Sequence, residues 1–211
     1  MTEPLIERRA FDGTVPNGVV SFTSMADGTA DDYALLDRYE RAHAAGLPDR
    51  ILASLDALTG SLGGYRITRL EHSLQSATRA RLDGASTDWV VAALVHDIGD
   101  ELAPFNHSEL AAAVVQPYVA AEIHWVILHH GVFQSYYYAH HLGGDRNARE
   151  QARAHRWAAL CAEFCARWDQ NSFDPEFPTH PLDSFVDDVR EVFGRVAWDP
   201  SVVTSGRERL D

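Results

Sequence analysis

The sequence predicts an all-α protein in which a helical domain follows an irregular arm. Apolar residues recur with helical spacing in one segment after another between residues 29 and 194. Glycine and proline stand between these segments, where they start or end helices. No stretch alternates apolar and polar residues as a half-buried strand would. We therefore expect an irregular N-terminal arm over 1–30, a single helical domain over 31–200 and a C-terminal tail over 201–211.

Start and stop signals divide the domain into its helices. Ser86 is placed to cap a helix, and Asn106 is placed to cap the one that begins near His107. Pro117 separates that helix from its successor, because proline breaks the backbone hydrogen-bond pattern. An aromatic loop precedes the longest of the later helices. The predicted helices cover residues 29–44, 49–58, 67–82, 87–98, 107–116, 120–130, 147–168 and 181–194.

The segment from Trp89 to Val95 is apolar on every side of its predicted helix. A helix of this kind belongs at the centre of a bundle. It ends in His96 and Asp97, so it delivers two polar side chains into the interior. Buried polar groups need partners there, and a metal ion is one way to supply them.

The charge balance and the apolar runs limit the partners and the compartment. The chain has 211 residues and a formal net charge of −13, and all 18 basic residues are arginine. Such a surface repels nucleic acid and anionic membranes. No apolar run approaches the roughly 20 residues that span a bilayer, and residues 1–13 lack the apolar core of a signal peptide. Cys161 and Cys165 are expected to be reduced and buried, and the protein to be cytoplasmic.

Histidine and aspartate residues fall on apolar faces of several predicted helices. His107 shares its face with Leu110, and Asp169 shares a face of small residues with Cys165 and Ala166. A carboxylate on such a face is costly unless it is paired or binds a metal. A lone histidine of this kind could be bonded to a backbone carbonyl, but the joint pattern predicts an inward-facing cluster. Its candidate metal ligands are His72, His96, Asp97, His107, Asp169 and one of His129 and His130.

The chemistry of these ligands indicates a pair of transition metal ions. Imidazole and carboxylate together suit iron, manganese or zinc rather than calcium or magnesium alone. The carboxylate of Asp97 could bridge two ions, as in two-metal sites whose ions lie about 3.5–4 Å apart.

The spacing of His72, His96-Asp97 and Asp169 resembles the HD superfamily, whose members are helical proteins with one or two metal ions. The resemblance covers residues 60–171 and implies an HD-domain helical bundle around a dinuclear metal site. Many members are phosphohydrolases. A smaller branch comprises mixed-valent diiron oxygenases, among them myo-inositol oxygenase and the PhnZ-type phosphonate-cleaving oxygenases.

Four segments carry the resemblance. The residues EHSLQSA (71–77) and NHSE (106–109) resemble the PhnZ-type oxygenases, and EFCARWD (163–169) is similar to myo-inositol oxygenase. HDIG (96–99) fits both branches. The resemblance implies that one ion binds His72, His96, Asp97 and Asp169, and that the other binds Asp97, His107 and His129. His130 is the alternative to His129, because His-His-Gly also occurs in HD phosphohydrolases. The implied cofactor is two iron ions (Fe2+/Fe3+), with Mn2+ or Zn2+ as the alternative.

The sequence departs from these oxygenases where they contact substrate. Leu62 and Tyr65 stand where PhnZ-type enzymes have a tyrosine and a glutamate. Asp100 stands where myo-inositol oxygenase has a lysine, and Phe133 where a substrate-contacting lysine follows the fourth histidine. Neither inositol nor an aminophosphonate is therefore the expected substrate.

The loop over 131–145 combines aromatic and polar residues beside a predicted ligand, which is typical of a substrate-binding lid. Its tyrosines could instead pack the bundle, Arg146 could simply start a helix, and Arg167 could form a surface ion pair. The candidate substrate-binding residues are Tyr65, Gln75, Gln134, Tyr136, Tyr137, His141, Arg146 and Arg167, with Arg66 and His140 as further candidates.

These observations favour a diiron oxygenase that oxidises or cleaves a small, polar, metal-chelating substrate with O2. The segment EHSLQ and the full set of six ligands support this reading. The alternative is a metal-dependent phosphohydrolase acting on a phosphate ester or nucleotide, in which two ions activate a water molecule. A third reading is a non-catalytic metal-binding HD protein.

Overall fold

Eight α-helices and several short 3₁₀ turns make up the chain between residues 12 and 203, the part that this computed structural model describes. The prediction of an all-α fold is confirmed, since no strand occurs in that part of the chain. The outer ends of the predicted arm and tail, residues 1–11 and 204–211, lie outside the described residues. The α-helices are α1 (Ala30–Ala45), α2 (Leu47–Ala57), α3 (Arg69–Leu82), α4 (Thr87–Val95), α5 (His107–Val115), α6 (Ala121–Gln134), α7 (Ala158–Phe164) and α8 (Val186–Phe193).

Helix α3 starts at a capping box. The hydroxyl of Thr68 accepts a hydrogen bond from the backbone N–H of Glu71 at 3.1 Å, and the Glu71 carboxylate accepts one from the backbone of Thr68 at 2.7 Å. The two bonds satisfy N–H groups that have no partner within the helix. Ser86 and Asn106 occupy the predicted cap positions, but neither side chain accepts a hydrogen bond from the backbone N–H groups of its helix. The side-chain amide of Asn106 instead donates to Glu109 at 3.0 Å.

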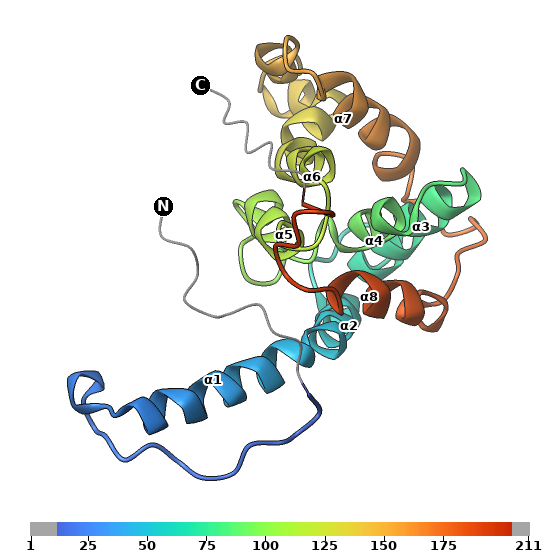
Figure 1. The fold of residues 1–211 in the computed structure, drawn as a ribbon. Helices are drawn as coiled ribbons and strands as arrows, with labels where there is room; N and C mark the ends of the chain where they lie inside the picture. Colours follow the sequence, from blue (N-terminus) through green and yellow to red (C-terminus); the bar gives the residue numbers. More distant parts are fainter. Residues whose placement is uncertain (1–11, 204–211) are drawn as a thin grey trace.

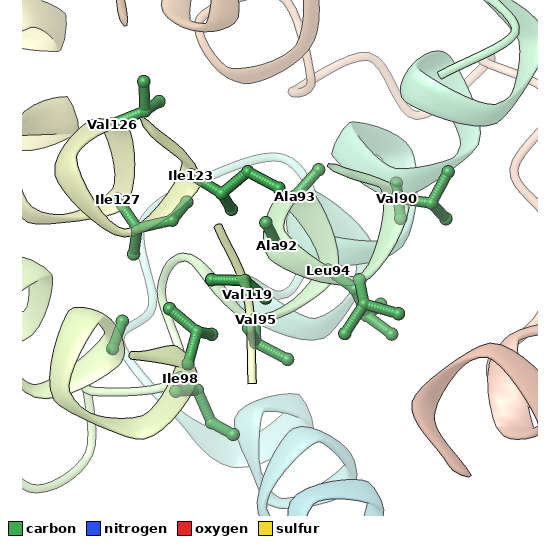
Figure 2. Close-up of a cluster of buried hydrophobic side chains, with 14 of the residues drawn as sticks. Val90, Ala92, Ala93, Leu94, Val95, Ile98, Val119, Ile123, Val126 and Ile127 are labelled. Atoms are coloured by element: carbon green, nitrogen blue, oxygen red, sulfur yellow. The ribbon is translucent and has the colours of Figure 1, made fainter. Parts of the chain in front are cut away.

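Helix α4 forms the centre of the bundle, as predicted. Its residues from Val90 to Val95 are buried. Figure 2 shows Val90 and the four side chains from Ala92 to Val95 in one apolar cluster with Val119 and with Ile123 and Ile127 of α6. Removing this apolar surface from water stabilises the fold by roughly 25 cal/mol per Å2. The end of the buried helix therefore lies in the interior, together with the His96-Asp97 pair that follows it.

Helices α3, α6 and α8 pack directly against α4. Helix α3 packs beside α4, α5 packs against α6, and α6 packs against α7, while α8 lies against both α2 and α4 (Figure 1). Helix α1 extends away from the other helices, at the opposite end of the molecule from α7 (Figure 1). Between residues 12 and 203 no helix combines the length and the apolar character that crossing a membrane requires.

The predicted helix over 147–168 is wrong in its first half. Residues Ala148–Ala152 form a 3₁₀ turn, η5, and α7 begins only at Ala158. The ring of His155 stacks on Trp125 of α6 with centroids 4.2 Å apart, and its Nδ1 accepts a hydrogen bond from the backbone N–H of Trp157 at 3.3 Å. The side chain thus takes a backbone donor that a helix would use, which is a tertiary effect on local structure.

Candidate metal centre

Four side chains from three parts of the fold meet in the interior and form what we call the inner set: His72 on α3, His96 and Asp97 after α4, and Asp169 in the π-helical turn η6 (Cys165–Asp169). The Nε2 atoms of His72 and His96 lie 3.1 Å apart. Asp97 Oδ2 lies 3.2 Å from the first and 3.3 Å from the second, and Asp169 Oδ1 lies 3.4 Å and 3.6 Å from them. All four residues are buried.

Two further imidazoles face the other oxygen of Asp97. The Nε2 atoms of His107 and His130 each lie 3.3 Å from Asp97 Oδ1. We call His107, His130 and Asp97 Oδ1 the outer set. The His130 side chain is fully buried, whereas that of His107 is 25% exposed. Asp97 thus faces a pair of histidines with each of its oxygens.

Backbone carbonyls orient three of the four imidazole rings. A carbonyl oxygen can only accept a hydrogen bond, so the Nδ1 atom beside it carries the proton. In a neutral ring the Nε2 atom then presents a lone pair, which is the form that binds a metal. The Nδ1 atoms donate as follows: His72 to Ser172 O at 2.8 Å, His96 to Ala93 O at 2.7 Å, and His130 to Ile127 O at 2.7 Å.

The buried imidazoles and carboxylates of the inner set shift one another's pKa values. Burial lowers the pKa of His96, but the nearby carboxylates of Asp97 and Asp169 outweigh burial and raise that pKa well above its usual value. Burial raises the pKa of Asp97, yet His96 and hydrogen bonds from neighbouring histidines leave it well below its usual value. Asp169 Oδ2 is buried and forms no hydrogen bond within residues 12–203. Lone pairs of this kind, held close together and away from water, fit a divalent cation. The buried His/Asp cluster could therefore hold metal.

Two glycines allow α5 to approach this cluster. A Cβ atom on Gly99 would lie 2.6 Å from the carbonyl oxygen of His107 and 2.8 Å from its Cα. A Cβ atom on Gly131 would lie 2.9 Å from Ser108 Oγ. The first contact is with backbone atoms, which cannot rotate away. Gly99 in the sequence HDIG is thus needed for the close approach that places His107 beside Asp97.

A wide helical turn places Asp169. The backbone N–H of Gln170 donates to the carbonyl of Cys165 at 3.0 Å, five residues back, as in a π-helix. Such turns are frequent at functional sites. The widened turn leaves Ala166 exposed while Cys165 and Asp169 are buried, so the predicted stripe of small residues holds only in part. Cys161 and Cys165 are both buried and unpaired, as predicted.

The structure brings His130, and not the favoured His129, to the cluster. His129 Nδ1 contacts the carbonyl of Trp125 at 2.8 Å, and its ring stacks on that indole with centroids 4.1 Å apart. On a helix, neighbouring residues point about 100° apart, so only one of the pair can face Asp97. Phe133, three residues after His130, does not reach the cluster. That residue is buried in the core against Trp125, and Gln134 is the one that reaches the cluster.

Three of the predicted substrate-binding residues lie at or next to the cluster. Gln134 Nε2 donates to Asp169 Oδ1 at 2.6 Å. Tyr65 stacks on Phe173 at 5.1 Å, and Phe173 stacks on His72 at 4.3 Å, so one ring separates Tyr65 from a candidate ligand. Burial raises the pKa of Tyr137, and the nearby Cys165 and Asp169 add to the rise.

The other predicted contacts have structural partners elsewhere. Gln75 is buried and bonds through its amide to the backbone of Asp174, at 2.7 Å and 3.3 Å. The guanidinium of Arg146 lies over the Tyr136 ring, 4.3 Å from its centroid. The rings of His140 and His141 have centroids 4.0 Å apart with their planes tilted by 40°, and both residues are exposed, as is Arg66.

Arg167 lies in a separate surface pocket of about 240 Å3, which is lined by Trp89, Trp168 and Phe164 among others. Its guanidinium pairs with Asp83 at 2.8 Å and with Glu163 at 2.7 Å. Arg167 thus forms a surface ion pair, which was the alternative to a role in substrate binding.

Two residues near the cluster, Arg69 and Tyr138, were missing from the sequence prediction. Arg69 is buried and pairs with both Asp97 and Asp100, with its Nε 2.7 Å from Asp100 Oδ2. Its position three residues before His72 places it on the same helical face, which is a signal that the sequence contains. Burial raises the pKa of Tyr138, with further contributions from Tyr65 and from the carboxylates of the inner set. No sequence pattern distinguished Tyr138 from its neighbours.

Comparison of the sequence with protein-family models and with curated proteins found no match. The chemistry of the cluster therefore has to be inferred from its own donor atoms.

Proposed function

We propose that this chain is a dinuclear metal enzyme of the HD type and that it acts as a diiron oxygenase. The observation that carries the proposal is the position of Asp97. One of its oxygens faces His72 and His96, and the other faces His107 and His130, at 3.2–3.3 Å in each case. A carboxylate with this environment suits a bridge between two ions that lie about 3.5–4 Å apart.

The donor set supports iron as the metal. Four imidazoles and two carboxylates form a mixed nitrogen and oxygen environment, which suits iron and also manganese or zinc. Calcium and magnesium favour oxygen donors alone. The similarity of EHSLQSA and EFCARWD to diiron oxygenases supports two iron ions over the alternatives.

The chain's own residues would bind, orient and shield a substrate. Bound iron would supply the redox chemistry with O2, while the protein provides ligands, orientation and exclusion of water. The inner set is fully enclosed, so access is expected on the outer side, where the His107 side chain is partly exposed. Gln134 holds Asp169 through a hydrogen bond of 2.6 Å. Tyr65 and Tyr138 are each about half exposed, and their hydroxyls would be the groups to contact a polar substrate. A small, polar, metal-chelating substrate fits these groups.

A phosphohydrolase is the second candidate, and Arg69 is the observation that favours it. Its guanidinium is buried beside Asp97 and Asp100. A guanidinium next to a metal centre suits a phosphate group, because the two match in charge and in geometry. The use of His130, in a His-His-Gly sequence that also occurs in HD phosphohydrolases, agrees with this reading.

Anaerobic loading with Fe2+ separates the two activities. We expect about two iron ions per chain and, after partial oxidation, an EPR signal of a mixed-valent Fe(II)/Fe(III) pair that candidate hydroxylated substrates perturb. Oxygen uptake that depends on such a substrate would establish oxygenase activity. Hydrolysis of generic phosphate esters by the Mn2+-loaded protein, without any oxygen uptake by the iron form, would overturn the oxygenase in favour of the hydrolase. Failure to bind metal at all would favour the non-catalytic reading.

A further inference from the structure

Two arginines face one tyrosine ring near the candidate metal centre. The guanidinium carbons of Arg146 and Arg149 lie 4.3 Å and 3.7 Å from the centroid of the Tyr136 ring, so they are at most about 8 Å apart. Tyr136 belongs to the 3₁₀ turn η3 (Ser135–Tyr137), which packs against η5, the turn that contains Arg149. Two positive charges held this close repel each other, and a bound anion would relieve that repulsion.

Neither of these guanidinium groups has a carboxylate partner. Within residues 12–203, seven arginines are buried or partly buried. Five of the seven form a hydrogen bond or an ion pair, namely Arg41, Arg69, Arg79, Arg81 and Arg195. Arg146 and Arg149 form neither in that part of the chain, and the Nε atom of Arg146 is buried without an acceptor. Contact with the tyrosine ring leaves their N–H groups available to donate to an anion.

The turn η3 connects this arginine pair to the metal centre. Gln134, the last residue of α6, donates to Asp169 Oδ1 at 2.6 Å, and η3 follows it directly. Burial raises the pKa of Tyr137, Cys165 and Asp169 add to the rise, and Arg149 opposes it. Arg149 and a candidate metal ligand thus both act on one tyrosine hydroxyl. An anion bound by the arginine pair would therefore lie beside the cluster and not on a remote surface.

We propose that Arg146 and Arg149 bind a dianionic oxyanion group of the phosphate class. A guanidinium group donates paired hydrogen bonds to phosphate oxygens, and two such groups match the charge of a dianion. A chain with a net charge of −13 repels anions over most of its surface, so such a ligand needs a local pair of free cations. Binding of the anion requires no metal ion. Its use as the anchor for the charged group of a substrate rests on the proposed function.

Calorimetric titration with inorganic phosphate tests the site, in about 0.15 M KCl so that long-range attraction is screened. We expect saturable binding with a Kd below about 1 mM, and binding of the singly charged acetate that is weaker by roughly tenfold or more. Arg146→Gln and Arg149→Gln should each weaken phosphate binding by roughly tenfold or more. Arg149→Lys keeps the charge and a long side chain beside Tyr136 but loses the planar fork, so its affinity should fall between those of the natural sequence and Arg149→Gln.

Arg153→Gln is the matched control, because it removes one positive charge from an exposed arginine of the same segment. It should bind phosphate within about twofold of the natural sequence, as expected for an exposed charge. A natural sequence without saturable binding up to about 10 mM phosphate overturns the inference. Equal affinities in Arg153→Gln and the folded Arg146 and Arg149 variants overturn it as well, since they indicate only general attraction. Both results leave the proposed function intact, whereas phosphate binding by a protein that cannot hold two metal ions supports the anion site and overturns the proposed function.

Discussion

Replacement of Gly99 by alanine probes how closely α5 must approach the candidate metal centre. The new methyl group would lie 2.6 Å from the carbonyl oxygen of His107 and 2.8 Å from its Cα. An ordinary contact begins near 3.4 Å, so Gly99 and the backbone at His107 must separate by about 0.8 Å relative to each other. Both contacted atoms belong to the backbone of the first residue of α5, so no side-chain rotation relieves the clash.

This displacement exceeds what a metal site tolerates. Ligand distances in such sites hold to about ±0.2 Å, so a shift of this size should remove His107 from the outer position. Overpacking of a well-packed interior costs about 1–3 kcal/mol. For a chain of this size, each kcal/mol lowers the melting temperature by roughly 2–4 °C. The inner set has no ligand on α5 and should retain its ion.

Thermal unfolding and Mn2+ titration of Gly99→Ala measure both effects. We expect a lower melting temperature and one Mn2+ ion per chain instead of two. Gly63→Ala is the control, since a Cβ atom there meets nothing within 4 Å. The reasoning would be refuted by a Gly99→Ala protein with the melting temperature and the two ions of the natural sequence.

Three further predictions concern the ligands and the start of α3. Asp97→Ala removes the carboxylate that faces both histidine pairs, so metal analysis should find fewer than two ions per chain; retention of both contradicts a bridging role. His130→Ala should lose metal while His129→Ala keeps it, because only His130 faces Asp97; equal metal content in the two variants speaks against this assignment. Thr68→Ala removes a capping bond and should destabilise the fold by about 1 kcal/mol in chemical denaturation; an unchanged midpoint would show that the cap contributes little.

Local sequence signals predicted the helices well where packing and propensity agree. Helix α4 is apolar on all sides and lies at the centre, as its composition requires. The prediction of one helix over 147–168 failed because the side-chain contact that interrupts it involves a residue distant in sequence. The ring of His155 packs on Trp125, which lies 30 positions earlier in the sequence. No periodicity within residues 147–168 indicates that contact.

The substrate-binding prediction was limited by the same cause. Gln75 and Arg167 carry functional groups suited to binding, but Asp174 engages the first and Asp83 and Glu163 engage the second. Only the fold brings these partners together. Arg69 was missed although it shares a helical face with His72, because nothing in the sequence shows that two acidic residues 28 and 31 positions later face it.

By itself, the sequence determined the helical class, the burial of α4 and the residue types available to a metal. These follow from periodicity, apolar content and the cost of burying histidine and aspartate, all of which are local properties. The tertiary structure decided the rest: that His130 and not His129 faces Asp97, and that each oxygen of Asp97 meets a different pair of histidines. Those facts depend on how α3, α5, α6 and η6 are rotated against the end of α4. That rotation is set by packing over the whole bundle and by the close approach at Gly99.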